Sequence, residues 1–193
     1  NKINSFMTFG KMPIANGFVN KENFNKEYFF EMEVGFNEEL SLFQLNDHPK
    51  PEKMFNENYP FFTGSSEFMK NHFKEYADFV KKNYLNSNSK IVEIGSNDGT
   101  FLKNFTDNKK NIIGFEPSNN VAEIAKNNQI PIVNEFFNTE NVSKLKKFLG
   151  NTDLVCASNV ICHVPDLNNL VESIDLILNK SGTFIFEEPY LGS

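Results

Sequence analysis

The stretch that decides the fold is Ile91-Val92-Glu93-Ile94-Gly95-Ser96-Asn97-Asp98-Gly99-Thr100. It joins a short apolar run to a loop with two glycines four residues apart, and we expect a helix from about Gly99. Glycines lack a Cβ, so a backbone that contains them can approach a ligand closely. The dinucleotide-binding fingerprint needs three glycines to seat a pyrophosphate. The loop therefore favours a ligand without a phosphate at this point, with an ordinary strand-to-helix turn as the alternative.

The same strand-then-helix pattern repeats outward from this loop. Strands of this kind, alternating with helical segments of ~10–15 residues, predict an α/β fold with a doubly wound parallel sheet. Such sheets bind ligands beyond the carboxyl ends of their strands. The predicted strands are Ile91–Ile94, Ile112–Phe115, Pro131–Val133, Asp153–Ala157 and Thr183–Glu187, and the later helices are Ser118–Asn127, Thr139–Leu149 and Pro165–Leu178.

The N-terminal third follows a different pattern. Apolar residues spaced by three and four predict a helix that begins at Ser65 or Ser66 and ends before 86–89. Before it, hydrophobic periodicity is weak, and only a strand pair around 28–34 and 40–45 is expected. We therefore predict a small irregular lobe over residues 1–64 and a ligand-binding domain over residues 65–193.

Composition excludes several classes of protein. The 193 residues contain 19 cationic side chains, all Lys, against 25 acids, for a net charge of −6. This balance argues against a nucleic-acid partner held by charge. The apolar runs are far shorter than the ~20 residues that cross a bilayer, so no membrane partner is expected. Two cysteines form no disulfide framework and favour a reducing, cytoplasmic compartment. Because the chain starts at Asn1 and stops directly after a strand-like run, we expect a fragment of a longer protein.

Two strand ends carry groups suited to a nucleoside. Glu116 follows Gly95 by 21 positions, about the spacing at which an acid accepts hydrogen bonds from a ribose diol. The alternative is a Glu that complements the dipole of the next helix. After the third strand, Phe136 and Phe137 could sandwich an adenine, although an aromatic pair is equally typical of a core.

The loop after the fourth strand adds Asn159 and His163. Asn159 stands where it could contact the ammonium or carboxylate of the ligand, and a histidine at 163 could carry a proton near neutral pH. A His that caps the following helix is the alternative. His72 lies on an apolar helix face and is expected to be partly buried, so no metal site can be assembled.

Taken in order, these motifs and several others resemble one family. The matching stretches are Met12-Pro13-Ile14-Ala15-Asn16, Ser41-Leu42-Phe43-Gln44-Leu45, Tyr59-Pro60 through Ser66, Met69 and His72, Val92–Gly99, Gly114–Ser118, Glu135-Phe136-Phe137, Asn159–Pro165 and Phe186–Gly192. The sequence is similar to the sugar-nucleotide C-methyltransferases of deoxysugar pathways, which methylate a carbon next to a ketone on a nucleotide-linked hexose. The resemblance covers nearly the whole chain.

The resemblance implies a Rossmann-like class I methyltransferase domain, S-adenosylmethionine as cofactor and a nucleotide-linked sugar as small-molecule substrate. It implies a base that removes the proton next to the ketone, after which the enolate carbon attacks the sulfonium methyl. The implied catalytic residues are His163 and Tyr59, and the implied substrate contacts are Ser66, Glu188 and Tyr190. The implied cofactor contacts are Glu93, Gly95, Ser96, Asn97, Asp98, Gly99, Glu116, Pro117, Phe136, Phe137 and Asn159.

Three departures from the family pattern matter. Asn37-Glu38-Glu39-Leu40 stands where the family's zinc lobe has its second Cys-x-x-Cys pair, so no zinc is predicted. Phe61 stands where an aromatic hydroxyl is common. The family's Tyr/Asp-Glu-His element, which provides the main base, would follow Ser193, so a C-terminal substrate part is expected to be missing. A degenerate, non-catalytic module that binds S-adenosylmethionine is therefore the alternative function, and an NAD(P)-dependent enzyme is disfavoured by the missing third glycine.

Overall fold

The computed structural model describes residues 3–15, 17–108 and 111–190. The chain divides into two units, Asn1–Tyr59 and Pro60–Ser193, and each is considered separately. The motif residues Asn16, Leu191 and Gly192 lie outside the described residues. Within the described ranges, every helix is too short or too polar to span a bilayer.

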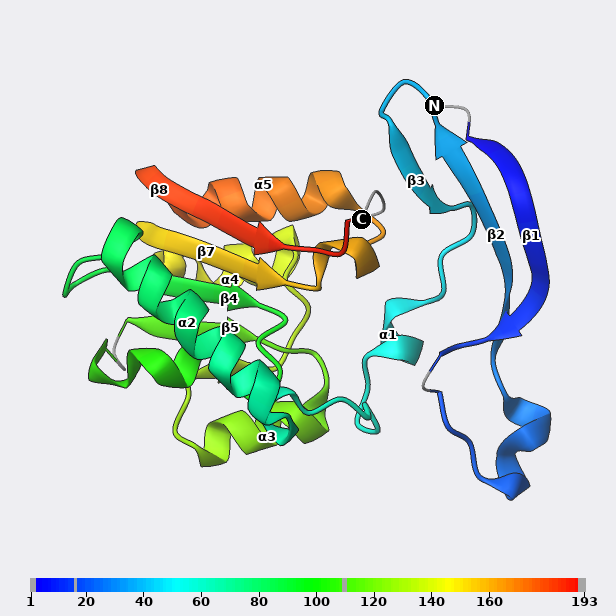
Figure 1. The fold of residues 1–193 in the computed structure, drawn as a ribbon, viewed down its shortest axis with the longest axis horizontal. Helices are drawn as coiled ribbons and strands as arrows, with labels where there is room; N and C mark the ends of the chain where they lie inside the picture. Colours follow the sequence, from blue (N-terminus) through cyan, green and yellow to red (C-terminus); the bar gives the residue numbers. More distant parts are fainter. Residues whose placement is uncertain (1–2, 16, 109–110, 191–193) are drawn as a thin grey trace. The chain divides into compact units, whose positions relative to one another are not determined.

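The first unit is built on an antiparallel sheet of strand order β1-β2-β3 (Figure 1). Its strands are β1 (Asn4–Pro13), β2 (Phe29–Asn37) and β3 (Leu42–Leu45), and its helices are η1 (Lys21–Lys26) and α1 (Pro51–Met54). The expected strand pair corresponds to β2 and β3. The expectation of an irregular segment is wrong for β1: nearly all of its side chains are exposed, so no buried face imposes an alternating pattern on its sequence.

The second unit holds a five-stranded sheet in which every neighbouring pair is parallel. Its strands are β4 (Ile91–Ile94), β5 (Ile112–Phe115), β6 (Ile132–Val133), β7 (Thr152–Ser158) and β8 (Leu178–Glu187). The spatial order β6-β5-β4-β7-β8 reverses direction at β4 (Figure 1). This confirms the predicted doubly wound α/β fold and puts the topological switch point between the carboxyl ends of β4 and β7.

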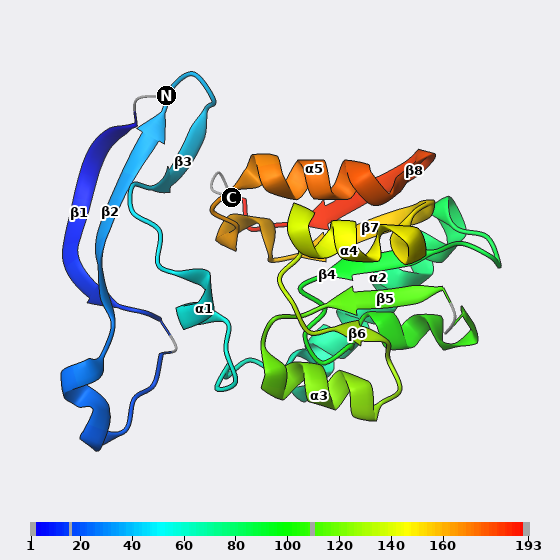
Figure 2. The ribbon, with the colours of Figure 1, turned by 180° about the vertical axis from the view of Figure 1, so that it is seen from behind.

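Helices cover both faces of this sheet (Figures 1 and 2). One hydrophobic cluster joins α2 (Glu67–Tyr84), η3 (Leu102–Asn108) and α3 (Asn119–Asn127) to the sheet, and a second joins α4 (Thr139–Leu149) and α5 (Leu167–Ile177) to its other face. The predicted start of α2 is confirmed, because Ser66 Oγ accepts the Met69 N–H at 3.3 Å.

The helix expected from about Gly99 differs from the prediction, because η3 is a 3-10 segment with a non-helical Phe105. Asn104 explains the difference. Its side-chain amide donates to the carbonyls of Thr100 and Phe101, at 3.1 and 3.0 Å. These carbonyls would otherwise accept α-helical backbone hydrogen bonds, so the side chain competes with the regular helix.

Candidate functional site

The glycine loop leaves β4 in a conformation that a side chain at position 95 would disturb. Gly95 has a φ of +66°, and a Cβ placed on it would lie 2.5 Å from Val160 Cγ2. Val160 comes from the loop after β7, so the structure brings two of the predicted functional loops into direct contact. Asn97, inside the glycine loop, is also left-handed, with a φ of +49°.

Three buried carboxylates gather at this loop. Glu116 accepts two backbone hydrogen bonds, from Asn97 N–H at 3.0 Å and from Ser118 N–H at 2.7 Å. Burial raises the pKa of Glu116, while these donors oppose the rise. Burial raises the pKa of Glu93 well above its ordinary value, and the charges of Glu116 and Asp98 raise it further.

These acids lack a cation of their own. In the described part of the chain, no ion pair includes Glu93, Asp98 or Glu116. Glu93 Oε2 and Ser96 Oγ are buried and form no hydrogen bond with any described residue. Buried polar atoms are normally satisfied, so this pair favours a ligand that supplies positive charge and donors.

The side chains of Asn97 and Asp98 bind the segment before α2. Asn97 Oδ1 accepts the Thr63 N–H at 2.9 Å, and its amide donates to the Phe61 carbonyl at 3.1 Å. Asp98 Oδ2 accepts the Gly64 N–H at 2.7 Å. Both side chains therefore fix residues 61–64 beside the glycine loop, a role the sequence did not reveal. Their contact with a cofactor stays a prediction.

The loop after β6 supports the Glu116 turn. Asn134 donates its side-chain amide to the carbonyls of Glu116 and Pro117, at 2.7 and 3.1 Å. Phe137 packs edge-on against Phe115, with ring centroids 5.0 Å apart, and belongs to the margin of the core. Phe136 is half-buried. The structure thus places Phe137 against the last residue of β5, while the contact of either phenylalanine with an adenine stays a prediction.

Glu188 organises the loop that carries His163. Its Oε1 accepts the N–H groups of Val160 and Ile161, at 2.7 and 2.6 Å, at the start of η4 (Ile161–His163). Asn159 precedes this turn with a φ of +55° and donates its N–H to the Glu187 carbonyl at 2.8 Å. The predicted residues Asn159, His163 and Glu188 thus form one local unit.

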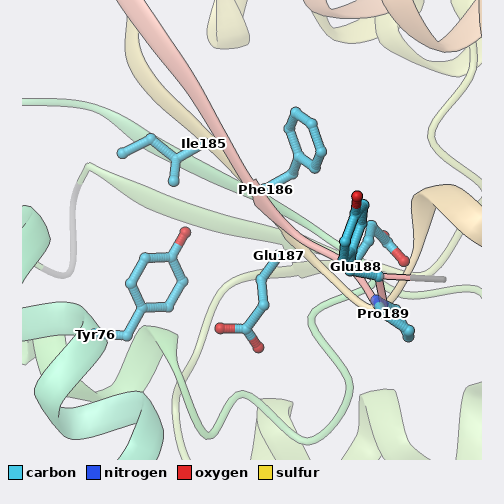
Figure 3. Close-up of a pocket in the computed structure, with 7 residues that line it drawn as sticks. Tyr76, Ile185, Phe186, Glu187, Glu188 and Pro189 are labelled. Carbon is cyan, nitrogen blue, oxygen red and sulfur yellow. The ribbon is translucent and has the colours of Figure 1, made fainter. Parts of the chain in front are cut away.

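A shallow, open hollow of about 480 Å³ lies beside this unit at the end of β8. It is lined by Tyr76, Ile185, Phe186, Glu187, Glu188, Pro189 and Tyr190 (Figure 3). Glu188 and Tyr190 were predicted from the sequence, whereas Tyr76 and Glu187 were not. Burial raises the pKa of Tyr76, and the side chain of Cys156 raises it further.

Two other predicted residues lie outside these groups. Ser66 uses its hydroxyl to cap α2. Tyr59 is the last residue of the first unit, where its ring lies 5.5 Å from that of Phe55. The substrate contact of Ser66 and the catalytic role of Tyr59 stay predictions.

In the first unit, Asn37 closes the turn between β2 and β3. Its buried side chain accepts the Leu40 N–H at 3.0 Å. Within the described ranges, no three His, Cys, Asp or Glu side chains come together as metal ligands.

Comparisons with known families cover both units. Residues 68–192 match the family described as a methyltransferase domain, and residues 1–55 match one described as a "putative zinc binding domain". The chain is also similar to C-methyltransferase NovU of Streptomyces niveus, with 24% identity over 187 residues. This similarity covers 96% of the chain but 44% of the relative, so the chain spans less than half of that protein's length.

Solved structures show the same fold. A SAM-dependent methyltransferase from Archaeoglobus fulgidus is 18% identical, with a TM-score of 0.53, over 66% of this chain and 54% of that one. Streptomyces venezuelae DesVI is 16% identical, with a TM-score of 0.51, over 66% and 53% of the two chains. The second unit therefore has the class I methyltransferase fold.

The residues of the first unit do not fit a zinc ion. Zinc sites use thiolate, imidazole or carboxylate ligands in tetrahedral geometry. The sequence has no cysteine before Cys156, and Asn37 and Leu40 join through a hydrogen-bonded turn instead.

Proposed function

Since this chain belongs to the family of methyltransferase domains, with S-adenosylmethionine as cofactor, we propose that it is part of a C-methyltransferase for a keto-deoxysugar nucleotide. The observation that carries the proposal is the extent of the similarity to a C-methyltransferase. It runs over 96% of the chain, whereas the methyltransferase domain alone would account for residues 68–192. The similarity therefore includes the first unit, which supports a C-methyltransferase in particular and not only the general methyltransferase fold.

The buried acids fit the cofactor. S-adenosylmethionine carries an ammonium and a sulfonium, and no described Lys or His forms an ion pair with Glu93, Asp98 or Glu116. Glu93 Oε2 is buried and accepts no hydrogen bond from any residue that the structure describes. A cationic, amino-acid-bearing ligand supplies the charge and the donors that this cluster lacks.

Glu116 is the proposed partner of the ribose. A carboxylate has about four lone-pair positions, and backbone N–H groups occupy two of those on Glu116. The two that remain can accept hydrogen bonds from a diol. Because Asn97 and Ser118 hold the carboxylate from both sides, its orientation is fixed before a ligand arrives.

When bound, S-adenosylmethionine supplies a methyl group whose bond to sulfur breaks, with the electron pair left on sulfur, as an acceptor carbon bonds to it. The acceptor carbon first loses its proton, and His163 is the proposed group that assists this transfer. Glu188 holds the turn that carries His163 through two backbone hydrogen bonds. Ser66 and Tyr59 keep their predicted roles in substrate binding and proton transfer.

Cofactor binding tests the first half of the proposal. Isothermal titration with S-adenosylhomocysteine is expected to give a dissociation constant in the micromolar range. Glu116→Ala removes two charged acceptors and is expected to weaken binding about tenfold or more. Glu123→Ala is the matched control, because Glu123 is a surface acid on α3 that pairs with Lys126. Absence of binding at millimolar ligand would refute the proposal.

Turnover tests the second half. The complete natural protein, with methyl-labelled cofactor and a panel of 4-keto-hexose nucleotides, is expected to place the label on a carbon next to the ketone. Label on oxygen or nitrogen would reject C-methylation. Cofactor binding without transfer to any member of the panel would favour the non-catalytic module instead.

A further inference from the structure

Glu93 carries a carboxyl group in the central strand of the parallel sheet. Its strand, β4, runs between β5 and β7, and Glu93 pairs in register with Gly114 on one side and with Cys156 on the other (Figure 1). Glu93 is only 5% exposed. Among the described residues, no group donates a hydrogen bond to its Oε2 atom. A negative charge at this position therefore lacks the donors that a buried charge normally needs.

A second polar group without a partner is buried at the same cross-strand position. Gly114 has no side chain, and the Ser96 hydroxyl occupies the place that a Cβ on Gly114 would take. Registered partners on neighbouring parallel strands project to the same face of a sheet, so this hydroxyl lies on the face that carries the Glu93 carboxyl. Ser96 Oγ is buried and forms no hydrogen bond with any described residue. Two such groups together indicate a partner that is not part of the protein.

The other two acids of the cluster have donors of their own. Glu116 accepts two backbone N–H groups, at 3.0 and 2.7 Å. Asp98 accepts the Gly64 N–H at 2.7 Å and the Thr100 hydroxyl at 2.7 Å. Hydrogen bonds of this kind favour the ionised form of a carboxyl group. Since Glu93 Oε2 has none, Glu93 is the acid of the three that is best suited to hold a proton.

The strand and helix packed against Glu93 supply no positive charge to it. The Cys156 thiol on β7 and the Tyr76 hydroxyl on α2 interact with Glu93, and burial raises the pKa of both groups. Both are therefore neutral near pH 7. His72, one turn before Tyr76 on α2, lies 2.9 Å from a carboxylate oxygen of Glu187, so a charge on its ring is compensated there. Only a ligand can then compensate an ionised Glu93.

From this arrangement, and resting on the proposed cofactor, we infer that Glu93 holds a proton until the positive charge of the ligand binds beside it, and then releases that proton to solvent. Binding of the cofactor is thus coupled to the loss of one proton from this carboxyl. The free protein avoids an unpaired buried charge, and the bound protein gains a paired one. The exchange favours nucleosides that carry a cation over neutral ones.

The pH dependence of binding tests the inference. The complete protein is titrated with S-adenosylhomocysteine, S-adenosylmethionine and the neutral 5′-methylthioadenosine between about pH 5 and pH 7, where an α-amino group with a pKa of about 7.7–8.0 stays protonated. The affinity of the wild type for the two cationic ligands should rise with pH, by up to about tenfold per pH unit, because one proton is released. The affinity for 5′-methylthioadenosine should stay constant.

Two cationic ligands identify the charge that drives the exchange. A rise in affinity with pH for both ligands assigns it to the ammonium, which they share. A rise for S-adenosylmethionine alone assigns it to the sulfonium. Either result supports the inference.

Variants assign the proton to Glu93. Glu93→Gln keeps the size of the side chain but cannot ionise, so its affinity for the cationic ligands should vary by less than about twofold over the same pH range. Glu123→Gln, which changes a surface acid paired with Lys126 on α3, is the matched control and should keep the wild-type pH dependence.

Infrared difference spectra give a readout that does not depend on affinity. The carbonyl band of a protonated carboxylic acid should disappear when a cationic ligand binds the wild type. The difference spectrum of Glu93→Gln should lack this change, and that of Glu123→Gln should keep it.

Four results would overturn the inference. An affinity of the wild type that is constant with pH for both cationic ligands would exclude the proton release and leave the proposed function in place. A pH dependence that persists in Glu93→Gln would assign the proton to another group, and its loss in Glu116→Gln would identify Glu116 as that group. An equal pH dependence for 5′-methylthioadenosine would separate the exchange from the ligand's charge. Absence of binding at every pH would reject the proposed cofactor, and the inference with it.

Discussion

Gly95→Ala tests whether close packing between two loops defines the site. The substitution adds a Cβ where φ is +66° and where Val160 Cγ2 would lie at 2.5 Å. The left-handed conformation costs a residue with a Cβ about 1–2 kcal/mol. Forcing an extra methyl into a packed position adds about 1–3 kcal/mol. The sum is about 2–5 kcal/mol, or a fall in Tm of roughly 5–15 °C for a domain of this size.

Two further variants separate these contributions. Gly10→Ala isolates the backbone cost, because Gly10 has a φ of +67° and nothing lies within 4 Å of a Cβ placed on it. Val160→Ala removes the methyl groups that the new Cβ would meet. The double variant Gly95→Ala/Val160→Ala is therefore expected to be more stable than the sum of its two single variants implies, by about 1–3 kcal/mol.

The assays are urea unfolding for stability and titration with S-adenosylhomocysteine for the site. Gly95→Ala should weaken the ligand, because Val160 must move and its N–H is bound to Glu188. The double variant should recover part of that affinity. Additivity of the two substitutions within about 0.5 kcal/mol would refute the packing argument.

Three more predictions follow from named contacts. Glu93→Gln should be more stable than the wild type at pH 8 and equally stable near pH 4. Burial raises the pKa of the Glu93 carboxyl, so the wild type loses unfolding free energy as the pH rises above the pKa of the unfolded chain, by at most about 1.4 kcal/mol per pH unit. Urea unfolding at both pH values measures the difference. Asn97→Ala should speed hydrogen exchange at residues 61–64, because two hydrogen bonds are lost. Asn97→Gly loses the same bonds but relieves the left-handed backbone, and it should speed exchange equally. Unchanged protection of these amides in either variant would contradict the assigned contacts. Cys162 should react slowly with iodoacetamide at pH 8, because burial and then Glu188 raise the pKa of its thiol to about 12. The reaction should be faster in Glu188→Gln. Mass spectrometry gives both rates, and equal rates would contradict the role of Glu188.

The second unit could be predicted from sequence because its strands are buried on both faces. Ile91–Ile94 and Ile112–Phe115 are continuous apolar runs, the pattern typical of parallel strands between helices, and they match β4 and β5 at both ends. β1 could not be predicted in this way. Its side chains face solvent along nearly its whole length, so its sequence records pairing with β2 but no buried face.

The spacing along one strand-loop unit predicted where Glu116 lies. The structure places its carboxylate beside the glycine loop, with Asn97 N–H bound to it, while its contact with a ribose stays a prediction. Contacts between distant segments escaped the sequence. Asp98 and Gly64 are 34 residues apart, and His72 and Glu187 are 115 residues apart. No local pattern encodes such pairs, because the sheet topology brings them together.

Two left-handed backbone conformations lie at the same edge of the sheet as the buried acids. Asn97 and Asn159 follow the adjacent strands β4 and β7, and both have a positive φ, +49° and +55°. Asn tolerates this conformation better than most residues, yet it costs about 1 kcal/mol or more relative to an ordinary turn. Such cost persists where the surroundings fix the backbone, and here Thr63, Glu116 and Glu187 provide the hydrogen bonds that do so. The two residues therefore lie together at the point where the strand order reverses, which is where doubly wound sheets bind their ligands.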